Sequence, residues 1–305
     1  MTKRPNFKGT FVALLTPFGP RGDLDEDRLR RHVEWLITEG VHGLIPCGSA
    51  GEFLQLTDHE REVLIRVTIE QAAGRIPVVA GATADATVEA QSWTRFAERV
   101  GADGVMVAPP FYSLPTEKEI LHHYELVAGS TSLPVMAYNN PATTGIDMRP
   151  PLIARLAAIE NIRYVKESTT DVRRVEDIHR RTDSRIAVFA GIHALESFLV
   201  GAAGWVSVPA NVAPQLSARL YDCVVDGDLR TARTISERLW DLMELEADTG
   251  KYVQVYKEAL ALEGDSVGLA RGPRLPLTDA ERERLREALV TLRKPIQDVS
   301  AVPTT

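Results

Sequence analysis

Residues 162–168 read Ile162-Arg163-Tyr164-Val165-Lys166-Glu167-Ser168, a mostly apolar run that stops abruptly at charged and polar side chains. A helical pattern of apolar residues follows it over residues 172–180. The run lacks the regular polar alternation of a strand that faces water on one side. This stretch therefore predicts a strand buried on both faces, followed by a helix.

The same pattern, an apolar run followed by an amphipathic segment, recurs along the chain. Seven further apolar runs end in Gly, Pro, Ser or Asn, and they cover residues 11–15, 43–47, 77–81, 104–108, 134–138, 186–190 and 205–208. Amphipathic segments separate the runs: the first covers residues 25–38, the second opens at residues 57–60, and the others cover residues 88–100, 117–128, 151–158, 172–180 and 194–200. Thr57 and Glu60 form a capping-box pattern at the start of the second segment. Strands that alternate with helices imply parallel pairing with right-handed crossovers.

Eight such units predict an α/β fold, a (β/α)8 TIM barrel. The alternative is an open doubly wound sheet, which commonly carries a glycine-rich nucleotide-binding turn after its first strand. Here the first run leads instead into Thr16-Pro17-Phe18-Gly19-Pro20. Helical patterns continue after the last run, so we expect a barrel in residues 1–225, a helical C-terminal extension in 226–293 and a mobile tail in 294–305.

Composition narrows the class of partner. The 305 residues carry a formal net charge of −7, which argues against a nucleic-acid partner. The start of the chain lacks the apolar stretch of a secretory signal, and no apolar run approaches the roughly 18 residues that span a bilayer. Cys47 and Cys223 lie far apart and have no metal-binding spacing. We expect a cytoplasmic protein that acts on a small molecule, without a membrane partner and without a cofactor.

Lys166 is the sharpest candidate for chemistry. It ends the strand Tyr164-Val165-Lys166, and the active site of a TIM barrel lies at the C-terminal ends of its strands. Burial disfavours the charged ammonium and exposes a nucleophilic lone pair for attack on a carbonyl group. The alternative is a structural lysine paired with Glu167 or another acid.

Hydroxyl groups stand at neighbouring strand ends. Tyr138 and Tyr112 follow two of the apolar runs, and Ser49 lies in a turn flanked by Gly48 and Gly51. A chain of hydroxyls can move protons during the formation and hydrolysis of a Schiff base. The two glycines allow close backbone approach, which offers N–H donors to a carboxylate.

At these positions the sequence resembles the dihydrodipicolinate synthase / N-acetylneuraminate lyase family of class I aldolases, over about the first 290 residues. The resemblance rests on motifs at four strand ends: Gly48-Ser49-Ala50-Gly51-Glu52, Tyr138-Asn139-Asn140-Pro141, Val165-Lys166-Glu167-Ser168, and Ser207 with Ala210-Asn211-Val212-Ala213-Pro214. It implies that Lys166 forms a Schiff base with pyruvate or a related 2-oxo acid.

The resemblance also assigns supporting roles. Tyr138 is implied to transfer protons, and Ser49 to link it to Tyr112. Backbone contacts to the oxo acid are implied at Gly191 and Val206. The family resemblance further implies a homotetramer, a dimer of dimers in which Tyr112 reaches into the neighbouring subunit's site.

Two departures from the family pattern affect the expected substrate. Ala50 stands where the family commonly has a second hydroxyl that helps to hold the substrate carboxylate. Thr143 stands where dihydrodipicolinate synthases have an arginine that meets the aldehyde's carboxylate, unless Arg173 or Arg271 reaches the site from elsewhere. A pocket lined by the polar side chains of Thr143, Thr144 and Asn140 suits a polyol better than a second carboxylate. We therefore expect cleavage of an unphosphorylated 2-keto-3-deoxy sugar acid, with poor condensation of aspartate semialdehyde. The alternatives are dihydrodipicolinate synthase activity itself, or a dehydratase or deaminase of the same family.

Three other classes compete with this hypothesis. A metal-dependent barrel enzyme needs His or carboxylate ligands at strand ends, and of the histidines only His193 is suitably placed, so no metal is expected. A phosphate-binding barrel uses glycine-rich loops after strands 7 and 8, which residues 191–193 and 201–204 do not supply. A non-catalytic protein that binds an oxo acid is left open, and turnover of any oxo acid would exclude it.

Overall fold

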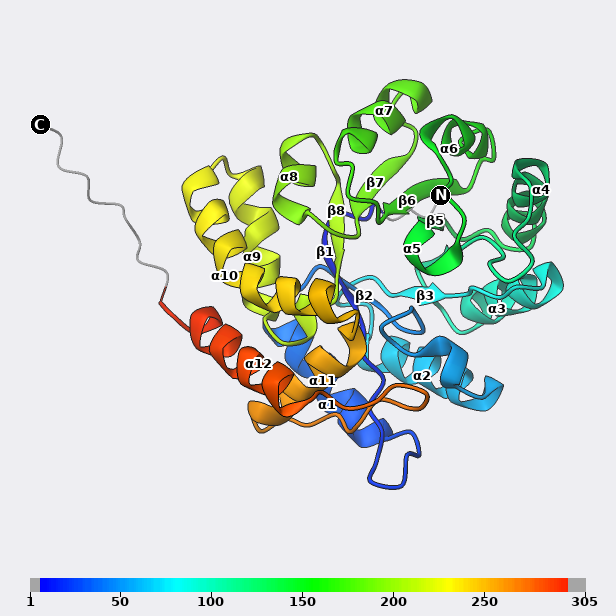
Figure 1. Ribbon diagram of the computed structural model, residues 1–305. Coiled ribbons are helices and arrows are strands. Elements are labelled where there is room, and N and C mark those ends of the chain that lie inside the picture. The colour runs from blue at the N-terminus through cyan, green and yellow to red at the C-terminus, as the bar shows by residue number, and fades with distance from the viewer. Residues whose placement is uncertain (1–5, 296–305) are drawn as a thin grey trace, which may run out of the picture.

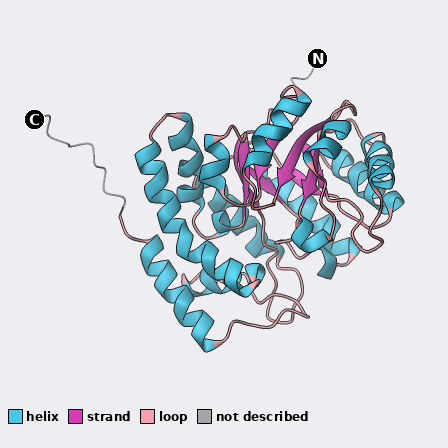
Figure 2. Ribbon diagram, turned by 45° about the horizontal axis from the view of Figure 1, so that its top comes forward, coloured by secondary structure: helices cyan, strands magenta, loops and turns pink. Residues whose placement is uncertain are grey.

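Each of the eight apolar runs forms a strand, and neighbouring strands pair in parallel. The computed structural model describes residues 6–295, in which helices surround the strands (Figures 1 and 2). The strands are β1 (Gly9–Ala13), β2 (Gly43–Ile45), β3 (Val79–Gly81), β4 (Gly104–Val107), β5 (Val135–Asn139), β6 (Ile162–Glu167), β7 (Ala187–Ala190) and β8 (Gly204–Ser207). Their order is β2-β1-β8-β7-β6-β5-β4-β3, and a parallel bridge between Leu44 and Val78 joins the two ends. The predicted (β/α)8 TIM barrel is confirmed.

The helices lie close to the predicted amphipathic segments. Those of the barrel are α1 (Glu26–Thr38), α2 (Asp58–Ala72), α3 (Thr87–Arg99), α4 (Glu117–Ala128), α5 (Pro141–Thr144), α6 (Pro150–Leu156), α7 (Arg173–Thr182), α8 (Ala194–Leu199) and α9 (Pro214–Val225), with short 3-10 turns η1 (Phe53–Gln55) and η2 (Pro209–Asn211). The capping box at α2 is present: the Thr57 hydroxyl accepts from the Glu60 amide, and the Glu60 carboxylate accepts from the Thr57 amide at 2.9 Å.

Three more helices follow the barrel, α10 (Leu229–Thr249), α11 (Tyr252–Leu262) and α12 (Asp279–Leu292). They gather on one side of the barrel, and the loop after α11 runs back toward α2 (Figure 1). Residues 296–305, most of the expected tail, lie outside the described residues. No helix in residues 6–295 has both the length and the apolar character needed to cross a bilayer.

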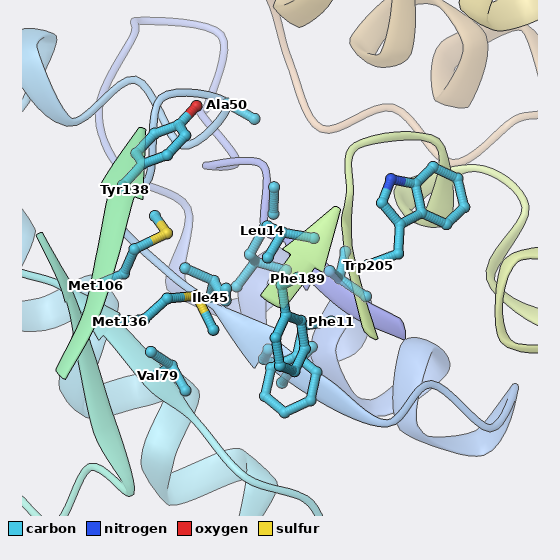
Figure 3. Packing of buried hydrophobic residues seen from close by; sticks show 14 of the residues in the cluster. Phe11, Leu14, Ile45, Ala50, Val79, Met106, Met136, Tyr138, Phe189 and Trp205 are labelled. Atoms are coloured by element: carbon cyan, nitrogen blue, oxygen red, sulfur yellow. The ribbon is translucent and has the colours of Figure 1, made fainter. Parts of the chain in front are cut away.

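Large apolar side chains from several strands fill the barrel interior (Figure 3). The rings of Phe11 and Phe189 meet edge to face with centroids 5.2 Å apart. A Cβ on Gly43 would lie 2.3 Å from the Phe11 ring, and one on Gly204 would lie 2.4 Å from the Phe189 ring. The interior is therefore a packed core, and the space for a ligand lies above it at the C-terminal ends of the strands.

Asn211 ties together the chain segments that end β1 and β8. Its buried side-chain amide donates to the carbonyls of Ala13 and Val208, both at 2.9 Å. Its oxygen accepts from the Leu15 amide at 3.1 Å and lies 3.2 Å from His32 Nε2. One buried side chain therefore satisfies polar groups from several chain segments.

Asn211→Asp tests this role, because it keeps the shape of the side chain but replaces its N–H donors by an acceptor. The carbonyls of Ala13 and Val208 would then face a carboxylate oxygen. We expect the free energy of unfolding to fall by about 2–5 kcal/mol, measured by urea unfolding at pH 7. The same substitution at the exposed Asn6 is the control and should change it by less than about 0.5 kcal/mol. Equal effects at the two positions would contradict the assignment.

Candidate active site

Lys166 and Tyr138 are direct neighbours across two strands. The register of β5 and β6 pairs Tyr138 with Lys166, so both side chains point to the same face of the sheet. Lys166 Nζ lies 4.2 Å from the centroid of the Tyr138 ring, and Lys166 is only 7% exposed. The amine and the phenol are thus held side by side by the backbone ladder.

Glu167, the acid next to Lys166 in the sequence, is engaged elsewhere. Strand alternation turns it to the opposite face. Its carboxylate accepts from Asn139 Nδ2 at 3.0 Å and from the Thr169 amide at 2.9 Å, and it lies 4.0 Å from Arg174 Nη1. These contacts argue against the interpretation of Lys166 as one half of a Lys166–Glu167 ion pair.

The Tyr138 phenol is oriented and made more acidic by its surroundings. Asn140 Nδ2 donates to the phenol oxygen at 2.8 Å. Burial raises the pKa of Tyr138, but the charge of Lys166 and hydrogen bonds with Asn140, Lys166 and Ser49 outweigh it, so the pKa lies below its usual value. A phenol in this state gives up its proton more readily than an ordinary tyrosine.

The turn after β2 brings Ser49 to Tyr138. It begins at Cys47, whose backbone is left-handed, with φ at +58°, and whose thiol pKa is raised to about 12 by burial. In Figure 3 the Tyr138 ring points from β5 toward the part of this turn that carries Ala50. In the described part of the chain, the amides of Ser49, Ala50 and Gly51 donate to no protein acceptor. Of the three, Ser49 lines the cavity at this end of the barrel, so its N–H group is available to a carboxylate there.

A cavity of about 90 Å³ opens at this end of the barrel. Its wall joins predicted site residues to side chains from several loops: Gly48, Ser49, Phe53, Leu54, Gln55, Thr83, Met106, Ala108, Phe111, Tyr138, Thr143, Thr144, Tyr252 and Arg274. Lys166 is not part of this wall, but its Nζ lies over the ring of Tyr138, which is. The volume suits a small acid better than a long chain.

The threonine hydroxyls in this wall are already used by the protein. The Thr144 hydroxyl donates to the Asn140 carbonyl at 2.9 Å and accepts from the Ile146 amide at 3.2 Å. The Thr143 hydroxyl also points to the Asn140 carbonyl, at 3.3 Å. They are therefore less available to a polyol than the sequence alone suggests.

A second cavity, of about 450 Å³, lies on the other side of Tyr252. Gly191 and His193 line it, together with apolar side chains that include Trp205, Trp240 and Met243. Packing requires a glycine at position 191, because a Cβ there would lie 1.8 Å from Ser168 Oγ. Within residues 6–295, no three His, Cys, Asp or Glu side chains group in a way that could hold a metal ion.

Lys166 acts electrostatically on both cavities. Its charge lowers the pKa of Tyr138 in the wall of the first cavity. In the wall of the second cavity burial raises the pKa of Glu246, and the hydrogen bond with Tyr256 and the charge of Lys166 oppose that rise. Lys166 therefore interacts electrostatically with one wall residue of each cavity.

Some candidates from the sequence stand outside both cavity walls. Tyr112 is 89% exposed, and its amide donates to Asp85. Val206 is buried in β8, and Ala50 and Gly51 are buried in the turn after β2. Of the arginines considered as substitutes at position 143, Arg173 pairs with Asp171 on the surface and Arg271 pairs with Glu60.

The wall residues that the sequence did not predict include two from the C-terminal extension. Arg274 lies in the loop between α11 and α12, and Tyr252 begins α11. Apolar periodicity detects helices and strands, but it carries no signal for which side of the barrel a C-terminal helix covers. Only the tertiary packing brings these two side chains over the barrel mouth.

Comparisons with known proteins agree with this geometry. The sequence profile of the dihydrodipicolinate synthetase family matches residues 6–292. The chain is 36% identical over 286 residues to the 4-hydroxy-tetrahydrodipicolinate synthase of Syntrophus aciditrophicus (strain SB), covering 93% of this chain and 97% of that protein. It is 38% identical over 292 residues to the protein of the same name from Methanospirillum hungatei, covering 93% and 98%.

Solved structures give the same result. The 4-hydroxy-tetrahydrodipicolinate synthase from Methylacidiphilum fumariolicum SolV superposes with a TM-score of 0.91 at 31% identity, over 94% of this chain and 96% of that one. YagE, a prophage protein of the dihydrodipicolinic acid synthase family from E. coli K12, was solved in complex with pyruvate; it gives a TM-score of 0.89 at 32% identity, over 94% and 98%. The expected family and enzyme class are confirmed: the chain belongs to the dihydrodipicolinate synthetase family, and it is an aldolase-type lyase.

Proposed function

We propose that Lys166 forms a Schiff base with pyruvate or a related 2-oxo acid, and that the resulting enamine condenses with an aldehyde that carries a carboxylate, such as aspartate semialdehyde. The observation that carries this proposal is the juxtaposition of a buried amine and an acidified phenol, 4.2 Å from Nζ to ring centroid. The free amide of Ser49, in the turn after β2, supplies a donor for the oxo acid's carboxylate.

The chemistry follows from this arrangement. The neutral Lys166 amine attacks the C2 carbonyl, and the carbinolamine loses water to give a protonated imine. Tyr138 supplies the proton that leaves with the hydroxyl group. Loss of a proton from C3 gives an enamine, whose carbon attacks the aldehyde carbonyl, and the new alkoxide takes up a proton. Ser49 connects the phenol with the cavity for these transfers.

The choice of aldehyde rests on two observations. The curated relatives described above are named 4-hydroxy-tetrahydrodipicolinate synthases, which favours the condensation over the sugar-acid cleavage expected from the sequence. The Thr143 and Thr144 hydroxyls, on which the sugar-acid hypothesis depended, bond to the Asn140 carbonyl. Cleavage of a 2-keto-3-deoxy sugar acid remains the second candidate, because position 143 carries no charge.

The third hydroxyl of the proposed relay, Tyr112, acts between subunits. Its exposure and its absence from the cavity wall support a role in the site of a neighbouring copy, within a homotetramer built as a dimer of dimers.

Borohydride reduction in the presence of pyruvate should attach the substrate covalently to Lys166. Reduction of an imine to a secondary amine fixes the added mass, and peptide mass mapping should find it on the peptide that contains residues 164–167. Lys166→Ala should take up no label. A label on the buried Lys257 or on Lys251 in wild-type protein would sink the assignment.

Tyr138→Phe should fold normally and lose about 10²–10⁴-fold in kcat, because the phenol's proton transfer is lost while its ring stays. Ser49→Ala should cost less, since water can replace a relay hydroxyl. Steady-state kinetics on both variants tests whether Tyr138→Phe loses more activity than Ser49→Ala. Thermal unfolding checks that both variants fold. Near wild-type turnover by Tyr138→Phe would remove the phenol from the mechanism.

Condensation of pyruvate with aspartate semialdehyde should exceed cleavage of 2-keto-3-deoxygluconate by at least about tenfold in kcat/KM, equivalent to about 1.4 kcal/mol in the transition state. Both reactions are to be measured on one preparation. Efficient sugar-acid cleavage without condensation would select the second candidate and leave the Schiff base at Lys166 intact.

A further inference from the structure

The cavity that contains Thr143 also contains a cation. Arg274 lines it together with Ser49, Tyr138 and Thr143, and its side chain is 20% exposed. It comes from the loop between α11 and α12, more than a hundred residues away from Thr143 in the sequence. Position 143 supplies no positive charge, but the same cavity contains one on a different element.

Charges around Arg274 are not balanced within the protein. Glu52 Oε1 lies 2.7 Å from Lys257 Nζ, and its other oxygen accepts from the Arg271 amide at 2.8 Å. Glu60 is taken by the Arg271 guanidinium. The three cations Lys257, Arg271 and Arg274 thus share two carboxylates, those of Glu52 and Glu60. Asp23 also interacts electrostatically with Arg271, but it lies on the solvent side beside Arg21.

Arg274 is the cation left over in this cluster. Its Nη1 lies 3.8 Å from Glu52, beyond hydrogen-bond range, and donates at 2.8 Å to Gln55 Oε1, which is neutral. Tyr252 shares a hydrogen bond with it and is also uncharged while protonated. A guanidinium at the edge of a low-dielectric cavity attracts a carboxylate more strongly than one on the open surface does.

We propose that Arg274 binds the carboxylate of the aldehyde substrate. It thereby takes the place of the arginine that is absent from position 143. The inference rests on the proposed condensation and names its specificity-determining residue. Arg274 sets which aldehyde is accepted and takes no part in forming the Schiff base.

The test compares aspartate semialdehyde with its methyl ester, which keeps the size of the substrate but removes the charge. In wild-type enzyme we expect a preference for the acid of about 10–100-fold in kcat/KM. Arg274→Gln should abolish this preference by lowering kcat/KM for the acid alone. Arg274→Lys should retain part of it, because a lysine keeps the charge but loses the planar, two-pronged donor geometry. Arg173→Gln, a surface arginine, is the matched control and should leave the preference unchanged.

Borohydride trapping with pyruvate separates this inference from the proposed function. Arg274→Gln should trap pyruvate at the wild-type rate. If Arg274→Gln lowers kcat/KM equally for the acid and the ester, or traps pyruvate more slowly, then Arg274 only supports the fold and the inference is overturned. A wild-type enzyme that traps pyruvate but does not prefer the acid overturns it too, while failure of wild-type enzyme to trap pyruvate refutes the proposed function.

Discussion

The ion pair between Glu52 and Lys257 connects the barrel to its C-terminal extension. Both side chains are almost completely buried, at 0% and 2% exposure, and they join the turn after β2 to α11. Burial lowers the pKa of Lys257 to about 8, so the lysine stays protonated at neutral pH beside its partner. Removing one member of a buried pair typically costs about 3–5 kcal/mol, because the other charge is left without compensation.

The completeness of the candidate site depends on this pair. Tyr252, at the first position of α11, and Arg274, in the loop after it, reach the barrel mouth only if α11 is docked there. The site therefore has two parts with different origins. Strand ends supply the amine, the phenol and the serine, and the C-terminal extension supplies the side chains that enclose them.

This division explains how much of the protein could be predicted from its sequence. Buried parallel strands leave near-continuous apolar runs, so all eight strands and the strand-end Lys166 and Tyr138 were found. Arg274 was not, because its position over Thr143 depends on long-range packing that no local pattern encodes. The same limit applies to the Thr143 hydroxyl: its bond to the Asn140 carbonyl depends on the α5 turn, and residue type alone suggested a free donor.

The pairing of Tyr138 with Lys166 in the β5–β6 ladder has a consequence for how this enzyme can change. Their spacing is set by the backbone separation of adjacent strands, about 4.8 Å, and not by any loop. Loops can lengthen, shorten or exchange their side chains without moving the amine away from the phenol. Changes confined to the segment between α11 and α12, which carries Arg274, can therefore alter the cavity wall while the amine and the phenol keep their spacing.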